Sequence, residues 1–204
     1  MFLNMEIDDF ISKLSSSSPT PGGGSVSALG AAMACGLFEM VIRISYKNIE
    51  EDMKHYSDIL NPLKKEAKEL IDKDSDAFEQ VMKAYALTKT TDEEKEIRRN
   101  AIQESLKLAA AVPFKTAQVC IALIRLTAEI AVLSKESCVS DAACAYNFAV
   151  AGFKGAIDNV IINLASIKDD TFVANFKKEI EELTFWYKNS KDSIETILNQ
   201  RLGA

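Results

Sequence analysis

Hydrophobic residues recur along most of this chain at the three- and four-residue spacing that is typical of amphipathic helices. The first such segment covers residues 4–14, with Asn4 as its expected cap and the serine run at 15–18 as its end. The segment from Val26 to Ser45 is apolar on nearly every side and rich in Ala and Gly. This pattern predicts a buried central helix whose small side chains let neighbouring helices approach closely.

A second long helix is predicted from about residue 51 to residue 87. Pro62 either kinks this helix or starts its main part. One carboxylate interrupts its apolar stripe, which consists of Leu63, Ala67, Leu70, Ile71, Asp74, Phe78, Met82 and Tyr85.

Polar capping residues mark where the remaining helices are predicted to begin. The run from Thr91 to Glu94 fits a capping box that opens a helix towards Leu133, with a bend at Pro113. Ser140 and Asp141 open another helix that runs to about Ile167. Asp170 or Thr171 then caps a final amphipathic helix that ends near Leu202.

No stretch shows sustained strand alternation, so the sequence predicts an all-α fold. We expect one domain over residues 1–204, a bundle of five to six helices of which two are near or above thirty residues. Such long apolar faces are difficult for one chain to cover, which favours a homodimer.

Composition narrows the function. The chain has 204 residues, of which 48% are hydrophobic, and a net charge of −6, which disfavours a nucleic-acid partner. Its four cysteines lack C-x-x-C spacing and no signal peptide is evident, so a cytoplasmic protein is expected. A membrane partner is not expected. If the apolar segment from Val26 to Ser45 crossed a membrane, Glu39 would lie within the hydrocarbon, and no other segment looks like a second span. Glu39 is instead expected to pair with Arg43, one turn later.

One histidine, His55, makes a Ser-His-Asp triad improbable, and the motifs of a zinc deaminase are absent. Carboxylates, amides, lysines and backbone groups therefore remain as candidate chemistry, and no metal or cofactor is predicted. Three consecutive glycines permit unusual backbone angles, and Ser25 can cap the following helix, so that N–H groups would converge on an anion. The alternative is a plain connection. The residues concerned are Pro21, Gly22, Gly23, Gly24 and Ser25.

Several motifs in order resemble one known family. They are PTPGGGSVSALGAAMA from Pro19, Asp74 with Ala77-Phe78 and Val81-Met82, Ala111-Val112-Pro113, Ser140-Asp141, and Asn159 to Leu164 followed by Ile167 and Asp169. The sequence resembles the formimidoyltetrahydrofolate cyclodeaminase and methenyltetrahydrofolate cyclohydrolase family over roughly residues 6–185. The resemblance implies an all-helical homodimer that binds a tetrahydrofolate derivative. It implies either cyclisation of 5-formimino-tetrahydrofolate to the 5,10-methenyl compound with loss of ammonia, or hydrolysis of the methenyl compound to 10-formyl-tetrahydrofolate.

Within that resemblance, Asp74 and Asp141 are the candidate catalytic acids. A carboxylate in an apolar stripe is desolvated and titrates nearer neutrality, although a purely structural pairing with a lysine or with another helix's end is the alternative. Asp141 at a helix start is either a capping residue or, with Ser140, a contact to the pterin edge or to N10. The neighbouring acids Asp72 and Asp76 are expected to be solvated.

Asn159 and Asn163 lie one turn apart on a face of small residues and need partners. They either bridge helices or hydrogen-bond the pterin or the formimino group. The 18 residues between Asp141 and Asn159 correspond to roughly 27 Å of helix, at about 1.5 Å per residue. The two groups therefore serve different parts of an extended folate, or the partner subunit supplies one of them.

The chain departs from the family pattern at Ser134-Lys135, where a Gly-Asn pair is usual. That change leaves a folate-binding protein without turnover as a further alternative, and a bundle used only for assembly as another. The glycine run would seat a carboxylate of the folate tail or form a wall for the pterin. Further candidate contacts to the tail are Arg98, Arg99 and Lys115, whereas the four cysteines and Trp186 are expected to serve packing.

Overall fold

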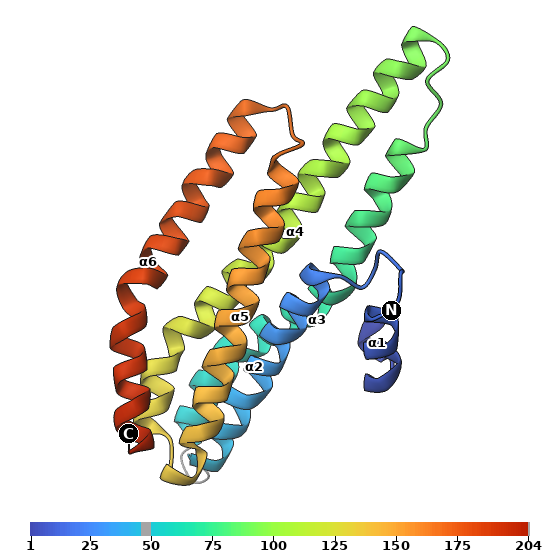
Figure 1. Cartoon of the computed structure of the whole chain (residues 1–204). Helices are drawn as coiled ribbons and strands as arrows, with labels where there is room; N and C mark the ends of the chain where they lie inside the picture. Colours follow the sequence, from blue (N-terminus) through green and yellow to red (C-terminus); the bar gives the residue numbers. More distant parts are fainter. Residues whose placement is uncertain (46–49, 204) are drawn as a thin grey trace.

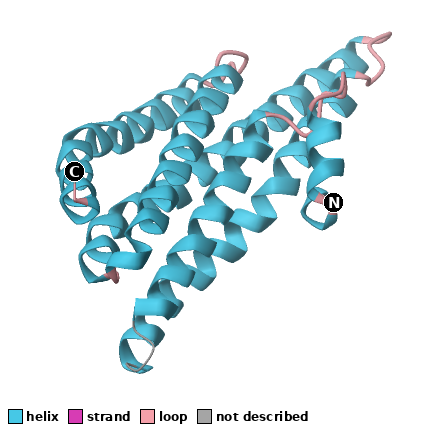
Figure 2. Ribbon diagram, turned by 60° about the horizontal axis from the view of Figure 1, so that its bottom comes forward, coloured by secondary structure: helices cyan, strands magenta, loops and turns pink. Residues whose placement is uncertain are grey.

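The computed structural model describes residues 1–45 and 50–203, which form helices without a strand in that part of the chain (Figures 1 and 2). The all-α prediction is confirmed. The elements in order are η1 (Phe2–Asn4), α1 (Ile7–Leu14), α2 (Gly23–Ser45), α3 (Glu50–Tyr85), α4 (Asp92–Leu133), η2 (Glu136–Cys138), α5 (Val139–Leu164) and α6 (Asp170–Leu202).

Helix α2 is the centre of the bundle and packs against α3, α4 and α5. Its small residues are fully buried, among them Ala28, Ala31 and Ala34. A Cβ added at Gly30 would lie 3.3 Å from the carbonyl oxygen of Phe148, and one at Gly152 would lie 2.8 Å from that of Ser27. Helices α2 and α5 can therefore approach backbone to backbone only because both positions lack a side chain.

Helices α3 and α4 extend beyond the start of α2 as a projecting pair (Figure 1). Here the predicted stripe is wrong, because Phe78, Met82 and Tyr85 are exposed by 38%, 51% and 46%. The residues that face inwards are the smaller Ala77, Val81 and Ala84. Beyond the core a helix has fewer neighbours, so the narrow contact between two helices selects small side chains.

The observed helix ends differ from the predicted ones at two caps and agree at a third. Helix α1 begins after Glu6, so Asn4 is not its cap, and Asp169 rather than Asp170 or Thr171 caps α6 by accepting from the Phe172 N–H at 3.0 Å. The predicted capping box at Thr91 is confirmed.

The expected pairing of Glu39 with Arg43 is not the contact that the fold uses. Glu39 on α2 instead accepts from Lys64 on α3 at 2.6 Å. Pro62 and Pro113 both lie inside helices.

Two helices, α2 and α4, are long and apolar enough to cross a membrane by length and composition alone, which is weak evidence for a span. The sequence argument that α2 had no second candidate beside it is thus wrong. In each, 56% of the apolar window is buried inside the bundle, as in a core helix of a soluble protein.

Candidate active site

The glycine run ends in the first turn of α2. Helix α2 begins at Gly23, and the Val26 N–H already donates to the Gly22 carbonyl at 3.0 Å, so Ser25 lies inside the helix and does not cap it. Among the described residues only Gly203 has a positive φ. The sequence suggested that the glycines are needed for unusual backbone angles, and that prediction is wrong. They are needed because other groups approach them closely.

The group that approaches Gly24 is the carboxylate of Asp74 on α3. A Cβ added at Gly24 would lie 2.0 Å from Asp74 Oδ1, so any side chain would displace the carboxylate. Ser25 donates to the same carboxylate twice, from Oγ to Oδ2 at 3.1 Å and from its backbone N–H. Burial raises the pKa of Asp74 above its usual range, and the two bonds from Ser25 lower it in part.

Asp74 thus makes the contact expected of a structural acid, because it accepts an N–H at the start of another helix. The same contact holds a desolvated carboxylate against Gly24, and part of the Asp74 side chain stays exposed. The structural and the functional interpretation therefore share one geometry.

Asn159 brings α5 to the same place. A Cβ added at Gly23 would lie 3.2 Å from Asn159 Nδ2, which donates to the Gly155 carbonyl at 2.7 Å. Three elements, α2, α3 and α5, therefore place the glycine run, Asp74 and Asn159 together. The sequence predicted these residues individually, and the fold unites them.

Asn163 has a different partner. Its Nδ2 donates at 2.6 Å to the carbonyl of Ala109 on α4. Pro113 lies four residues after Ala109 and has no N–H, so the helix itself cannot satisfy this carbonyl. Asn163 supplies the missing donor, which is the helix-bridging role that the sequence analysis left open.

Ser140 and Asp141 lie at the opposite end of α5, in its first turn. Ser140 is exposed and Asp141 half-buried. The structure therefore does not bring Asp141 to Asp74 within one chain.

The loop at this end holds the Ser134-Lys135 pair. Arg201 of α6 donates from Nε to the Ala131 carbonyl at 3.1 Å and from Nη2 to the Ser134 carbonyl, and the Lys135 N–H donates to Ser45 Oγ at 3.0 Å. The residues that replace the usual Gly-Asn pair are thus fastened to α2 and α6.

The cationic candidates for a folate tail have partners of their own. Arg98 donates to the Tyr85 carbonyl at 3.0 Å, Arg99 lies 3.8 Å from Glu96, and Lys115 lies 3.7 Å from Glu66. All three are bound within the α3–α4 pair.

The packing predictions need two corrections. Cys144 is exposed although Cys35, Cys120 and Cys138 are buried, so one cysteine does not serve packing. Asp72 is not simply solvated, because it accepts the Phe2 N–H, whereas Asp76 is exposed as expected. Trp186 is half-buried, and the Arg125 guanidinium lies 4.7 Å from its ring centroid.

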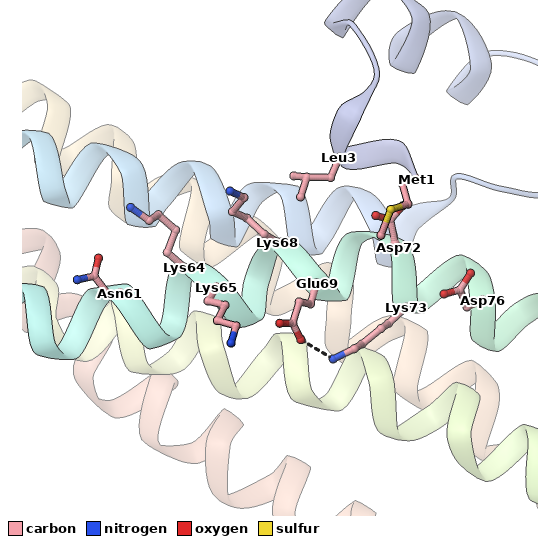
Figure 3. Close-up of a pocket in the computed structure, with 10 residues that line it drawn as sticks. All are labelled: Met1, Leu3, Asn61, Lys64, Lys65, Lys68, Glu69, Asp72, Lys73 and Asp76. Atoms are coloured by element: carbon pink, nitrogen blue, oxygen red, sulfur yellow. Dashed lines mark hydrogen bonds and ion pairs between the residues drawn. The ribbon is translucent and has the colours of Figure 1, made fainter.

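A cavity of about 470 Å³ runs along α3 below the N-terminus and contains four lysines (Figure 3). Lys73 turns back to Glu69 at 2.7 Å, and Lys64 pairs with Glu39. Lys65 and Lys68 point to opposite sides of α3 (Figure 3). These charges do not converge on one point, so this cavity is not the site that the polar residues define.

Ser75 is a residue that the sequence analysis missed. It is 8% exposed, and its Oγ lies 3.2 Å from Ser25 Oγ. It also lines a cavity of about 460 Å³ between α3 and the segment before α2. A signal was present, because Ser75 follows the buried Ala67 and Ile71 at four-residue spacing on one helical face.

Fold and site together define an all-helical protein in which a partly buried carboxyl group, hydroxyls and an amide meet at a glycine-lined helix start. Within residues 1–45 and 50–203, no three His, Cys, Asp or Glu side chains come together as a metal site. The chain belongs to the formiminotransferase-cyclodeaminase family, which it matches over residues 6–182.

Three relatives show the range of this family. The chain is 37% identical over 185 residues to the methenyltetrahydrofolate cyclohydrolase of Methylorubrum extorquens, covering 88% of this chain and 89% of that protein. It is 33% identical to the formimidoyltransferase-cyclodeaminase of Sus scrofa over 89% of this chain but only 34% of that protein, so it spans about a third of the bifunctional relative. The crystal structure of formiminotetrahydrofolate cyclodeaminase from Thermotoga maritima superimposes with a TM-score of 0.80 at 30% identity, covering 98% of this chain and 96% of the other.

Proposed function

We propose that this protein cyclises 5-formimino-tetrahydrofolate to 5,10-methenyl-tetrahydrofolate and releases ammonia. The observation that carries the proposal is the carboxyl of Asp74, held against Gly24 by two bonds from Ser25 and desolvated enough to raise its pKa. A carboxyl group whose pKa is raised holds a proton more readily than an ordinary Asp and can both accept and return one. The structural neighbour from Thermotoga maritima, matched along almost its whole length, supports the same reaction.

The chemistry requires two proton transfers. N10 of the folate attacks the formimino carbon, a base removes the N10 proton, and an acid protonates the nitrogen that departs as ammonia. Asp74 is suited to the first role as a carboxylate and to the second once it carries that proton. Asn159, whose Oδ1 accepts no hydrogen bond within the described part of the chain, is suited to hold the polar edge of the pterin.

The direct test is turnover. Purified protein is incubated with 5-formimino-tetrahydrofolate, and the rise in methenyl absorbance is followed together with free ammonia. Equal amounts of both products are expected. Protein that binds the substrate but releases no ammonia would show that the cyclodeaminase proposal is wrong.

A second candidate is hydrolysis of 5,10-methenyl-tetrahydrofolate to 10-formyl-tetrahydrofolate. It is favoured by the 37% identity to the methenyltetrahydrofolate cyclohydrolase of Methylorubrum extorquens, which this chain matches over 89% of that protein's length. The methenyl compound is the product of one reaction and the substrate of the other, so one pocket fits both. Loss of methenyl absorbance above the spontaneous rate, without ammonia, would identify this activity.

We also propose a homodimer in which the site is shared between subunits. The support is indirect: large apolar side chains such as Phe78, Met82 and Ile97 are exposed on the projecting α3–α4 pair, and Asp141 lies too far from Asp74 to act with it in one chain. The cytoplasmic location and the absence of nucleic-acid, membrane, metal and cofactor partners stay predictions from the sequence.

A further inference from the structure

Two buried hydroxyl groups continue from Asp74 in a line. Ser25, with no exposed surface, lies 3.1 Å from Asp74 Oδ2 and 3.2 Å from the Oγ of Ser75. Ser75 follows Asp74 on α3, and both side chains contact Ser25 in the first turn of α2. Three oxygen atoms thus form a continuous hydrogen-bonded chain across the α2–α3 contact.

The number of protons in this chain fixes its direction. A serine hydroxyl has one proton to donate and two lone pairs to accept with. While Asp74 is ionised, Ser25 donates to Asp74 and Ser75 donates to Ser25. When Asp74 carries a proton it can donate to Ser25, and both serines then donate in the opposite direction. The chain can therefore exist in two orientations with the same heavy-atom positions.

The far end of this chain reaches solvent. Ser75 is part of the wall of the 460 Å³ cavity, together with Pro19, Thr20 and Phe78. At about 30 Å³ per water molecule, such a cavity has room for several ordered waters. Its charged groups are Asp72, Asp76 and Glu79 from α3 and Lys13 from α1. From α2, Ser25 bonds to Asp74, and from α5 the neutral Asn159 lies against Gly23, next to the Gly24 that contacts Asp74.

We propose that Ser25 and Ser75 relay protons between Asp74 and this cavity. The relay rests on the proposed function. In one direction the Asp74 proton passes to Ser25 Oγ, the Ser25 proton passes to Ser75 Oγ, and the Ser75 proton passes to water. Each hydroxyl ends with one proton, and the reverse sequence reprotonates Asp74.

The reaction needs such a route. Methenyl cation and ammonia together carry one hydrogen more than neutral 5-formimino-tetrahydrofolate, so each turnover of the neutral substrate takes up one proton from solvent. A folate bound over Gly23 and Gly24 would cover the side of the Asp74 carboxyl whose Oδ1 faces Gly24. The relay brings the proton in from the other side of the carboxyl, through α2 and α3.

The test compares Ser75→Ala with Ser75→Thr, which keeps the hydroxyl, and with Ser105→Ala, which removes a hydroxyl bonded within α4. Single-turnover methenyl formation is measured over pH in H₂O and D₂O. Ser75→Ala is expected to slow this step about ten-fold, less than the ~10²–10⁴ that a general acid contributes directly, with unchanged KM and a larger solvent isotope effect. Ser75→Thr is expected to restore the rate, and Ser105→Ala to match wild type.

A second readout does not depend on turnover. The Asp74 carboxyl is titrated by ¹³C NMR in wild type and Ser75→Ala, and the variant is expected to have the higher pKa, because Ser25 loses the donor that supports its bond to the carboxylate. Active wild type with a Ser75→Ala enzyme of the same rate and isotope effect would overturn the relay alone. Wild type that turns over neither folate would overturn the proposed function itself.

Discussion

The two ends of α5 carry polar residues with the same proposed role but in very different surroundings. At one end Asn159 lies against Gly23, within a cluster in which Asp74 and Ser25 are tied together by hydrogen bonds. At the other end Ser140 is exposed and Asp141 is half-buried. The surroundings of a carboxyl group decide whether it can transfer protons. Within one chain, only the carboxyl group of Asp74, near the Asn159 end, is surrounded by groups that bind it. The second end therefore needs a partner subunit or an extended substrate to take part.

Replacement of Asp74 is the sharpest way to test this comparison. Asp74→Asn keeps the shape and removes the titrating proton, so turnover is expected to fall by about 10²–10⁴-fold. Asp58→Asn, an exposed acid earlier on α3, is the matched control and is expected to keep wild-type activity. An active Asp74→Asn protein would remove Asp74 from the mechanism.

Stability should change in the opposite sense. Because the folded pKa of Asp74 is raised, the native state binds more protons than the unfolded state between the unfolded and the folded pKa. The contribution of Asp74 to the free energy of unfolding is therefore fully present below the unfolded pKa and is lost as pH rises through the folded pKa. Asp74→Asn is expected to lack this loss and to be at least as stable as wild type at neutral pH. Urea denaturation at several pH values measures both.

Asp141→Asn tests whether the distant end participates. We expect a clear loss of turnover and, if the site is shared, recovery on mixing with Asp74→Asn protein. A mixed dimer then contains one intact site formed by wild-type Asp74 of one subunit and wild-type Asp141 of the other. With random exchange, half of the dimers are mixed and activity returns to about a quarter of wild type. Asp141→Asn protein with full activity would leave the distant end without a catalytic role.

Two glycines of α2 offer a matched pair with effects of opposite sign. Gly24→Ala places a methyl group 2.0 Å from Asp74 Oδ1 and is expected to cost about 1–3 kcal/mol as well as activity. Gly36→Ala meets nothing within 4 Å and is expected to stabilise the helix by about 0.5–1 kcal/mol. Thermal denaturation with activity measurement compares them. If both variants behaved alike, Gly24 would not be the seat of the carboxylate.

A stability measurement separates Asn163 from the cluster around Asn159. Asn163→Ala orphans the Ala109 carbonyl and is expected to cost about 1–3 kcal/mol of stability. In a Pro113→Ala background the helix regains its own donor to that carbonyl, so the cost of Asn163→Ala should shrink. A double-mutant cycle by urea denaturation measures this coupling, and additive costs would contradict it.

Much of the fold could be predicted from the hydrophobic period, because helices such as α4 and α6 repeat it over many turns. The capping box at Thr91 was readable because all its partners lie within four residues. The pairing of Glu39 with Lys64 and the exposure of Phe78 on the projecting α3–α4 pair could not be predicted, because both depend on which helices are neighbours in space.

The candidate site shows the same limit. Asp74 and Asn159 could be recognised as polar residues on apolar faces. The contacts of Asp74 with Gly24 and of Asn159 with Gly23 could not be predicted, because they depend on how three helices pack. Asn163 could be linked to Pro113 only once α4 and α5 were seen side by side. Ser75 was hidden in a polar run, although its spacing from Ile71 placed it on the buried face.

The grip of Arg201 on the carbonyls of Ala131 and Ser134 also concerns how the protein can be handled. Arg201 is the fourth residue from the end of the sequence, and its guanidinium binds the carbonyls at the end of α4. Deletion of the last four residues would remove Arg201 and release the turn that carries Lys135 and leads to Asp141. Purification tags and fluorescent labels are therefore better attached after Ala204 through a spacer than in place of the final residues.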